Sequence, residues 1–85
     1  MTDAEYFKYE LLEKAMPRED WRLDVVFRNG VCGVFDCTPY LSRKFWQRLN
    51  DPMFFKMVTV EHGTLAWPDD IDIEPEEVWH NSVKG

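Results

Sequence analysis

Four carboxylates in the last third of the sequence are the side chains best placed to do chemistry. Asp69, Asp70, Asp72 and Glu74 lie within one short stretch, and carboxylate oxygens are the ligands that Ca²⁺ and Mg²⁺ prefer. The calcium-loop pattern D-x-D-x-D-G is absent, and the stretch contains no glycine to make the sharp turn. We therefore interpret it as a solvated acidic loop that favours the start of the helix after it, and we predict no metal and no other cofactor.

Two cysteines and two histidines raise the possibilities of a zinc site or a nucleophilic centre. Cys32, Cys37, His62 and His80 show neither C-x-x-C nor H-x-x-x-H spacing, and no nucleophile motif surrounds either thiol. Cys32 and Cys37 are an odd number of residues apart in one predicted strand, so their side chains should point to opposite faces and not form a disulfide. We predict two free thiols, no catalytic residue and no enzymatic activity.

The net charge of −6 is carried by one end of the chain. Residues 57–85 hold seven acids and one lysine, whereas residues 1–56 hold nine acidic and nine basic side chains. Such an end repels nucleic acid and attracts basic partners, so we expect no direct nucleic-acid binding. The short basic group Arg43, Lys44 and Arg48 fits the exposed face of a helix.

The 85 residues suit one small domain, which we expect to be frayed at residues 1–6 and 83–85. No apolar run approaches the length of a membrane span, and the acidic start has no signal-peptide pattern. We therefore expect a cytoplasmic protein that does not contact membranes. Residues 7–16 fit either a helix or a strand, and Pro17 ends either element.

A first hairpin is indicated by two alternating stretches around Asn29-Gly30. This dipeptide favours a type I′ turn, which joins strands at residues 21–28 and 31–36. A two-residue loop sets Phe27 opposite Cys32 and leaves the Asp36 carboxylate at the end of the core side. The same register leaves three apolar residues on the outer face: Val26, Val31 and Phe35.

Helices and a second hairpin follow. Thr38-Pro39 favours a helix start, with a stripe at Leu41, Phe45 and Leu49, and Pro52 favours a further single turn. Strands at 56–61 and 64–67 should meet at a two-residue turn. A last short helix should begin after Glu74, at Pro75, and reach about residue 80. The fold class is α+β: a small antiparallel sheet built from two hairpins plus an N-terminal strand, with two short helices.

The order of these motifs resembles a small bacterial family known as domain of unknown function 2442. The resemblance covers residues 14–82 and rests on four groups of residues. The matching segments are Trp21, Leu23, Phe27 and Asn29-Gly30; Phe35-Asp36; Phe45 to Phe55; and Gly63 to Trp67 with Asp72 to Trp79. Val78-Trp79 stands where the family usually has Leu-Tyr, a change that keeps the polarity class. The resemblance implies an opening strand at residues 7–16 and carries no catalytic residue to this chain.

Members of that family resemble partners of toxins in bacterial toxin–antitoxin pairs, and some resemble domains attached to a helix-turn-helix. We therefore expect a protein-interaction module, antitoxin-like, that binds a basic toxin-like protein. The alternative is an accessory or oligomerisation domain of a transcriptional regulator that lacks its helix-turn-helix half, with homodimerisation as a rival use of the apolar face. The expected partner-binding residues combine the outer apolar positions with acids of the last third: Val26, Val31, Phe35, Asp69, Asp70, Glu76 and Glu77.

Overall fold

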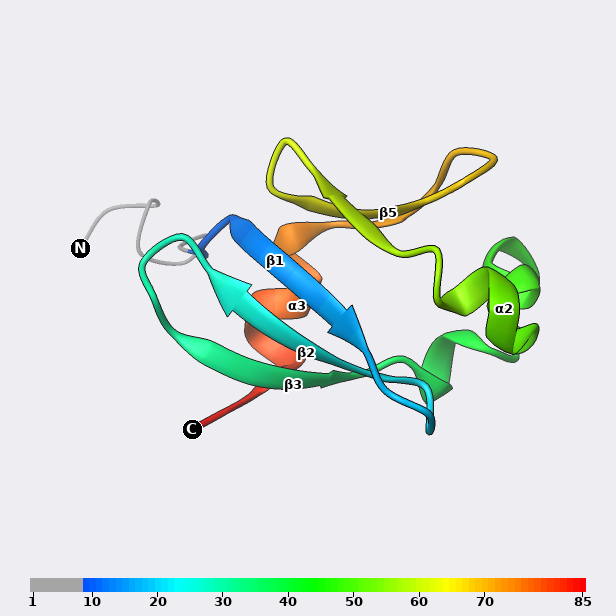
Figure 1. Ribbon diagram of the computed structural model, residues 1–85, viewed down its shortest axis with the longest axis horizontal. Helices are drawn as coiled ribbons and strands as arrows, with labels where there is room; N and C mark the ends of the chain where they lie inside the picture. Colours follow the sequence, from blue (N-terminus) through cyan, green and yellow to red (C-terminus); the bar gives the residue numbers. More distant parts are fainter. Residues whose placement is uncertain (1–8) are drawn as a thin grey trace.

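The computed structural model describes residues 9–85 and confirms the α+β class. Two small antiparallel sheets and several short helices make up this part of the chain (Figure 1). The four-stranded sheet has the order β1-β2-β3-β7, and the three-stranded sheet has the order β4-β5-β6. Helix α3 (Pro75–Asn81) lies behind the larger sheet in the view of Figure 1 and covers one of its faces. The other face of that sheet is turned toward the viewer.

The edges of the four-stranded sheet come from the two ends of the described chain. β1 (Leu12–Pro17) confirms the expected opening strand from residue 12 onward, and it ends at the proline. Residues 1–8, including the start of that predicted strand and the expected frayed segment 1–6, lie outside the described residues. Residues 83–85, which we expected to be frayed, include β7 (Val83–Lys84), which pairs with β3 at Val34 and Gly33.

The first hairpin forms between β2 (Arg22–Phe27) and β3 (Cys32–Asp36), but its predicted register is wrong. The N–H of Gly30 donates to the carbonyl of Phe27 at 2.9 Å, which makes a four-residue turn in which only Gly30 has a positive φ, 88°. The turn is therefore type I followed by a bulge glycine, and the loop holds three residues instead of two. The Asn29 side chain accepts from the N–H of Val31 at 3.0 Å, which stabilises this loop.

The extra loop residue exchanges the two faces of β3. Leu23 lies opposite Phe35, and Val25 lies opposite Gly33. Phe35 is 1% exposed and belongs to the core, and Val31 packs against the core as a half-buried residue. The expectation that Phe35 and Val31 lie on the outer face is therefore wrong. Val26 lies on the outer face, as expected, but it pairs with Cys32, which the predicted register had set opposite Phe27.

The second hairpin confirms its predicted register. β4 (Thr59–Glu61) and β5 (Thr64–Trp67) pair Val60 with Leu65, and the two turn residues, His62 and Gly63, have φ values of 53° and 80°. Positive φ at both central positions is the geometry of a type I′ turn. Sequence reasoning missed the next strand, β6 (Ile71–Ile73), which pairs with β5.

The predicted helix after residue 38 is replaced by two 3₁₀ segments. These are η1 (Thr38–Tyr40) and η2 (Lys44–Asn50), which are separated by extended backbone at Arg43. The predicted single turn is α2 (Pro52–Phe55), where the carboxylate of Asp51 accepts from the N–H of Met53 at 3.0 Å. Leu49 is buried as expected, but Phe45 is 54% exposed and is not part of the core stripe.

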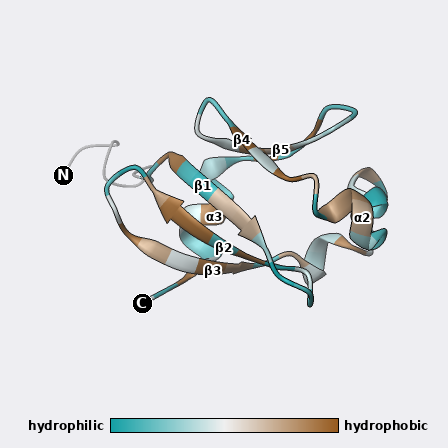
Figure 2. Cartoon of the chain, in the orientation of Figure 1, coloured by the Kyte–Doolittle hydropathy of each residue, from teal (hydrophilic) through white to brown (hydrophobic). Residues whose placement is uncertain are grey.

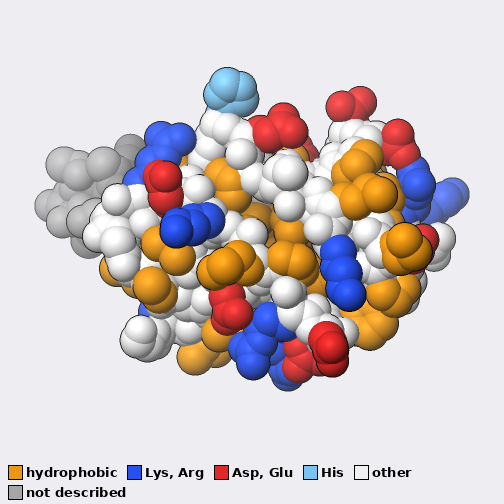
Figure 3. Space-filling model, in the orientation of Figure 1, with side chains coloured by type: hydrophobic (Ala, Val, Ile, Leu, Met, Phe, Trp, Pro, Cys, Tyr) orange, Lys and Arg blue, Asp and Glu red, His pale blue; other side chains and the backbone are white. Residues whose placement is uncertain are grey.

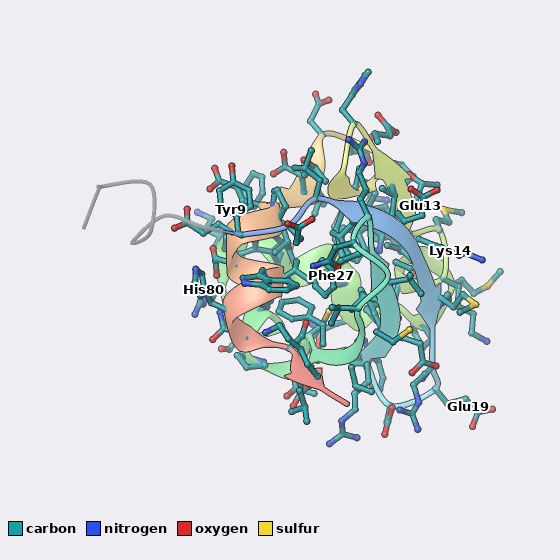
Figure 4. All side chains as sticks on the ribbon, turned by 90° about the vertical axis from the view of Figure 1, so that its left-hand side faces the viewer. Tyr9, Glu13, Lys14, Glu19, Phe27 and His80 are labelled. Atoms are coloured by element: carbon teal, nitrogen blue, oxygen red, sulfur yellow. The ribbon has the colours of Figure 1, made fainter. Side chains whose placement is uncertain are left out.

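The core lies between the larger sheet and α3 and continues under the smaller sheet. Phe27 meets Trp79 of α3 edge to face at 4.8 Å, and in Figure 4 Phe27 points toward the helix while Lys14 and Glu19 point away. Trp67 stacks on Phe55 at 6.2 Å, and its indole N–H donates to the Phe55 carbonyl at 2.9 Å. Figure 2 shows hydrophobic residues along β2 and β3, and hydrophilic residues at the tips of the β4–β5 and β5–β6 hairpins.

Both cysteines are free, with Cys32 exposed and Cys37 buried. Burial, with a smaller effect of the Asp36 carboxylate, raises the pKa of Cys37 from its ordinary 9.0 to about 12.

At pH 8 we expect a disulfide reagent to label Cys32 rapidly and Cys37 only on unfolding, and Cys32→Ser should remove the rapid phase. Rapid labelling of two thiols per folded chain would contradict this. Because the unfolded state loses the Cys37 proton first, this thiol should lower the free energy of unfolding as pH rises from about 9 toward 12.

Candidate interaction surfaces

The face of the larger sheet opposite α3 is uncovered within the described residues and carries apolar side chains among several charged ones. We call it the outer sheet face, and Figure 3 looks onto it. Two registers define its rows, because residues directly opposite each other in paired strands share a face. One row holds Lys14, Val26 and Cys32. A second row holds Met16, Asp24, Val34 and Val83, and a third row holds Arg22 and Asp36.

The outer sheet face is hollowed at its centre and raised at its edges. A shallow groove of about 430 Å³ runs over Val26 and Val34. Met16 on edge strand β1 is 51% exposed, and Val83 on edge strand β7 is 76% exposed. Single exposed hydrophobic residues are ordinary on protein surfaces, but a continuous set across four strands is typical of a surface that becomes covered.

A second surface, made by the smaller sheet, its β5–β6 turn and the start of α3, carries most of the acids. We call it the acidic surface, and it is defined by Glu61, Asp69, Asp70, Asp72, Glu74 and Glu76. Two hollows, of about 340 and 420 Å³, lie among these side chains. Asp69 and Asp70 both have positive φ, 65° and 63°, in the turn that joins β5 to β6. Between residues 9 and 85, the one ion pair on this surface joins Asp69 to Arg48.

The acidic surface is not a built metal site. Over residues 9–85, no group of three or more His, Cys, Asp and Glu side chains is arranged to hold a metal ion. Alternation along β6 explains the spacing of Asp70, Asp72 and Glu74, because Ile71 and Ile73 between them are buried while these acids are exposed. This alternation is the signal in the sequence that could have identified β6 as a strand.

Glu77 belongs to neither surface. The hydroxyl of Tyr40 donates to its carboxylate, which ties α3 to η1. Burial, together with this hydrogen bond and the Glu77 charge, raises the pKa of Tyr40 well above its usual range. The side chain of Arg43 lies over the Tyr40 ring, 4.8 Å from its centre, and beside Trp46. Glu77 therefore stabilises the packing of η1 against α3.

The structure separates the residues that the sequence grouped into one binding site. Val26 lies on the outer sheet face, and Asp69, Asp70 and Glu76 lie on the acidic surface. Phe35 and Val31 face the core, as shown above. Sequence reasoning missed Val34 and Val83, whose place on the outer sheet face depends on the true register and on the β3–β7 pairing.

These features define a small α+β domain with an apolar sheet face and a separate acidic surface. The chain belongs to the family described as protein of unknown function, DUF2442, whose model matches residues 12–84. This match confirms the resemblance found in the sequence. Searches of curated proteins and of solved structures found no match to the chain. None of the described helices is long and apolar enough to cross a membrane.

Proposed function

We propose that the chain is a non-enzymatic protein-interaction module of the bacterial cytoplasm, antitoxin-like, whose acidic surface binds a basic protein. The observation that supports this most directly is the collection of six acids on one surface, with Arg48 as their one ion-pair partner among the described residues. Like charges without counter-charges repel one another and slightly destabilise a fold. The grouping of six acids on one surface therefore has a cost for stability, which favours a role for them in attracting a partner.

The chemistry of the partner follows from this surface. The hollow between β4 and the β5–β6 turn has carboxylates on its rim, at Glu61, Asp70 and Asp72, and a lysine or arginine side chain would find several acceptors there. Exposed charges mainly accelerate association and set its salt dependence, because water and ions screen them beyond about 10 Å at 0.1 M salt. The complex should therefore form fastest at low ionic strength.

Reversal of one charge on the acidic surface should slow capture of the partner. The probe is the basic protein that the immobilised chain retains from its native host, identified and then purified. For Asp72→Lys we expect a roughly tenfold lower association rate at low salt and a smaller difference at high salt. Glu19→Lys is the matched control, since it changes the charge equally on the β1–β2 connection. Equal rates for the two variants, or a retained partner that is acidic, would refute the proposal.

A second candidate is an accessory or oligomerisation domain of a transcriptional regulator. The outer sheet face favours it, because an uncovered apolar sheet face suits association that does not depend on charge. The gene adjacent to this one in the host genome would discriminate the two: a small basic product supports the first function, and a helix-turn-helix product supports the second.

A further inference from the structure

Residues 43–57 form a cationic region in a chain that is acidic as a whole. The segment comprises η2, α2 and the residues next to them, and Figure 1 shows α2 at the right-hand end of the molecule. We call residues 43–57 the cationic end. It holds four of the ten lysine and arginine side chains and one acid, Asp51, so its charge is +3 in a chain of net charge −6.

Most of these cations are not neutralised by the protein itself. Among residues 9–85, Arg43, Lys44 and Lys56 form no ion pair, and all three side chains are exposed. The fourth cation takes part in the ion pair with the acidic surface described above. The guanidinium of Arg43 lies over the Tyr40 ring, a contact that holds the charge in place without neutralising it. An anionic partner would therefore meet three cations that are free to bind it.

Three large apolar side chains are exposed in the same segment. Phe45 is 54% exposed, Met53 is 75% exposed and Met57 is 52% exposed, which makes half of the six large hydrophobic residues exposed within residues 9–85. The segment packs on the core through other side chains, among them Phe54 and Phe55, which are buried. Figure 3 shows Lys and Arg side chains beside hydrophobic ones at the right-hand end of the molecule. Arginine, methionine and aromatic residues are the types enriched where proteins bind one another.

We propose that the cationic end binds a flexible acidic segment of a partner protein, in which apolar residues recur among aspartates and glutamates. The charge of this end favours acidic side chains, and its exposed apolar side chains favour apolar residues in the same segment. The cationic end projects from the molecule, so a flat rigid surface would reach only part of it, whereas a flexible chain can wrap around it.

Two other anionic partners fit these observations less well. Nucleic acid gains little from Met53 and Met57, because a methionine side chain has no ring on which a base can stack. The ion pair between Arg48 and Asp69 places the acidic surface next to the cationic end, and those acids would repel a long phosphate backbone or an anionic membrane. A short segment can bind the cations and avoid the acids. This inference does not depend on what binds the acidic surface.

The test is fluorescence anisotropy with a labelled synthetic peptide of about twelve residues, built by repeating Glu-Glu-Leu. We expect a dissociation constant of about 10–100 μM at about 50 mM salt, and binding weaker by roughly tenfold at about 300 mM salt, because salt screens exposed charges. A second peptide with serine in place of each leucine should bind roughly tenfold more weakly than the first, since it lacks the apolar contacts.

Two variants, each with a matched control, locate the site on the chain. Lys44→Glu should weaken binding of the leucine peptide by roughly tenfold, whereas Lys14→Glu makes the same change of charge on β1 and should leave binding unchanged. Met53→Ser should weaken binding by roughly fivefold, whereas Met16→Ser, at another exposed methionine, should not. All four residues are exposed, and near-ultraviolet circular dichroism reports whether each variant keeps the fold.

Several results would overturn the proposal. A leucine peptide that stays unbound at about 1 mM chain would do so. Equal weakening in Lys44→Glu and Lys14→Glu would show that only the overall charge matters, and equal binding of the leucine and serine peptides would show that no apolar contact forms. Tighter binding of a single-stranded oligothymidylate, or of vesicles that contain phosphatidylserine, would assign the cationic end to nucleic acid or to a membrane instead. Asp72→Lys should not weaken binding of the peptide, so this proposal and the one for the acidic surface can fail separately.

Discussion

Replacing Gly63 with alanine should destabilise the protein by about 2–5 kcal/mol. Gly63 has φ +80°, a conformation that costs an alanine roughly 1–2 kcal/mol. A Cβ atom here would also lie 2.7 Å from the Cβ of Leu11, and that atom cannot rotate away because it is attached directly to the backbone. The backbone itself is held, since the N–H of Leu12 donates to the Gly63 carbonyl at 2.9 Å. Overpacking of this kind typically adds about 1–3 kcal/mol.

Gly30→Ala is the matched control, because it makes the same chemical change at a similar φ of +88°. Among the described residues, no atom lies within 4 Å of a Cβ built at Gly30, so this variant should lose only the conformational term of about 1–2 kcal/mol. Both free energies of unfolding can be measured by urea denaturation. Equal losses in the two variants would show that the contact with Leu11 does not contribute.

Phe35→Ala should cost about 3–5 kcal/mol, because the ring is 1% exposed and its removal leaves a cavity beneath the sheet. The ring packs against Tyr40 at 5.9 Å between centroids, so the variant should also loosen η1. A loss of this size is a large fraction of the stability of a small domain, and a melting temperature lower by about 12 °C or more is expected.

Val34→Thr tests the same register from the neighbouring residue. Val34 is half-buried on the outer sheet face, so an isosteric polar replacement should change the free energy of unfolding by no more than about 0.5 kcal/mol. With the two-residue loop that the sequence suggested, the ranking would be reversed, because Val34 would then lie in the core and Phe35 would not. A larger loss for Val34→Thr than for Phe35→Ala would therefore reject the structure's register.

The two hairpins show why one register was predictable and the other was not. His62-Gly63 was interpreted as a two-residue turn, and both residues have positive φ, as such a turn requires. Asn29-Gly30 is compatible with two loops: the type I′ turn that it favours, and a type I turn followed by a bulge glycine. Local preference therefore pointed to the first loop, although the structure contains the second. The burial of Phe35 decides between the two loops, because only the three-residue loop places its large ring in the core.

A signal against the two-residue loop was present in the sequence. That register placed Asp36 on the core side opposite Leu23, and a buried carboxylate without a partner is costly. In the structure Asp36 lies opposite Arg22, and its carboxylate accepts from the N–H of Thr38 at 2.9 Å. The wrong register also misplaced Phe35 and Val31 of the predicted binding site, because their exposure depended on which face of β3 points outward.

The helical segments were predictable only in part, because tertiary contacts override local preference there. The spacing of Leu41, Phe45 and Leu49 is helical, but the indole of Trp46 donates to the carbonyl of Asp72 at 2.9 Å on the smaller sheet. The carbonyl of Leu41 accepts from the side-chain amide of Asn50 at 2.8 Å. The hydrogen bonds from Trp46 to Asp72 and from Asn50 to Leu41 are compatible with two short 3₁₀ segments and not with the one continuous helix that we predicted. The local spacing of apolar residues does not reveal these contacts.

The pairing of β7 with β3 has a consequence for how the chain folds. Each of the two hairpins closes a short loop, which costs little conformational entropy and is quick to form. The contact between Gly33 and Lys84 instead encloses nearly the whole second half of the sequence, including α3 and the smaller sheet. Because so much of the chain lies between the two partners, we expect those elements to form before the two residues of β7 pair with β3. Assembly should then run from the hairpins to this final strand, with the edge of the larger sheet at Val83 completed last.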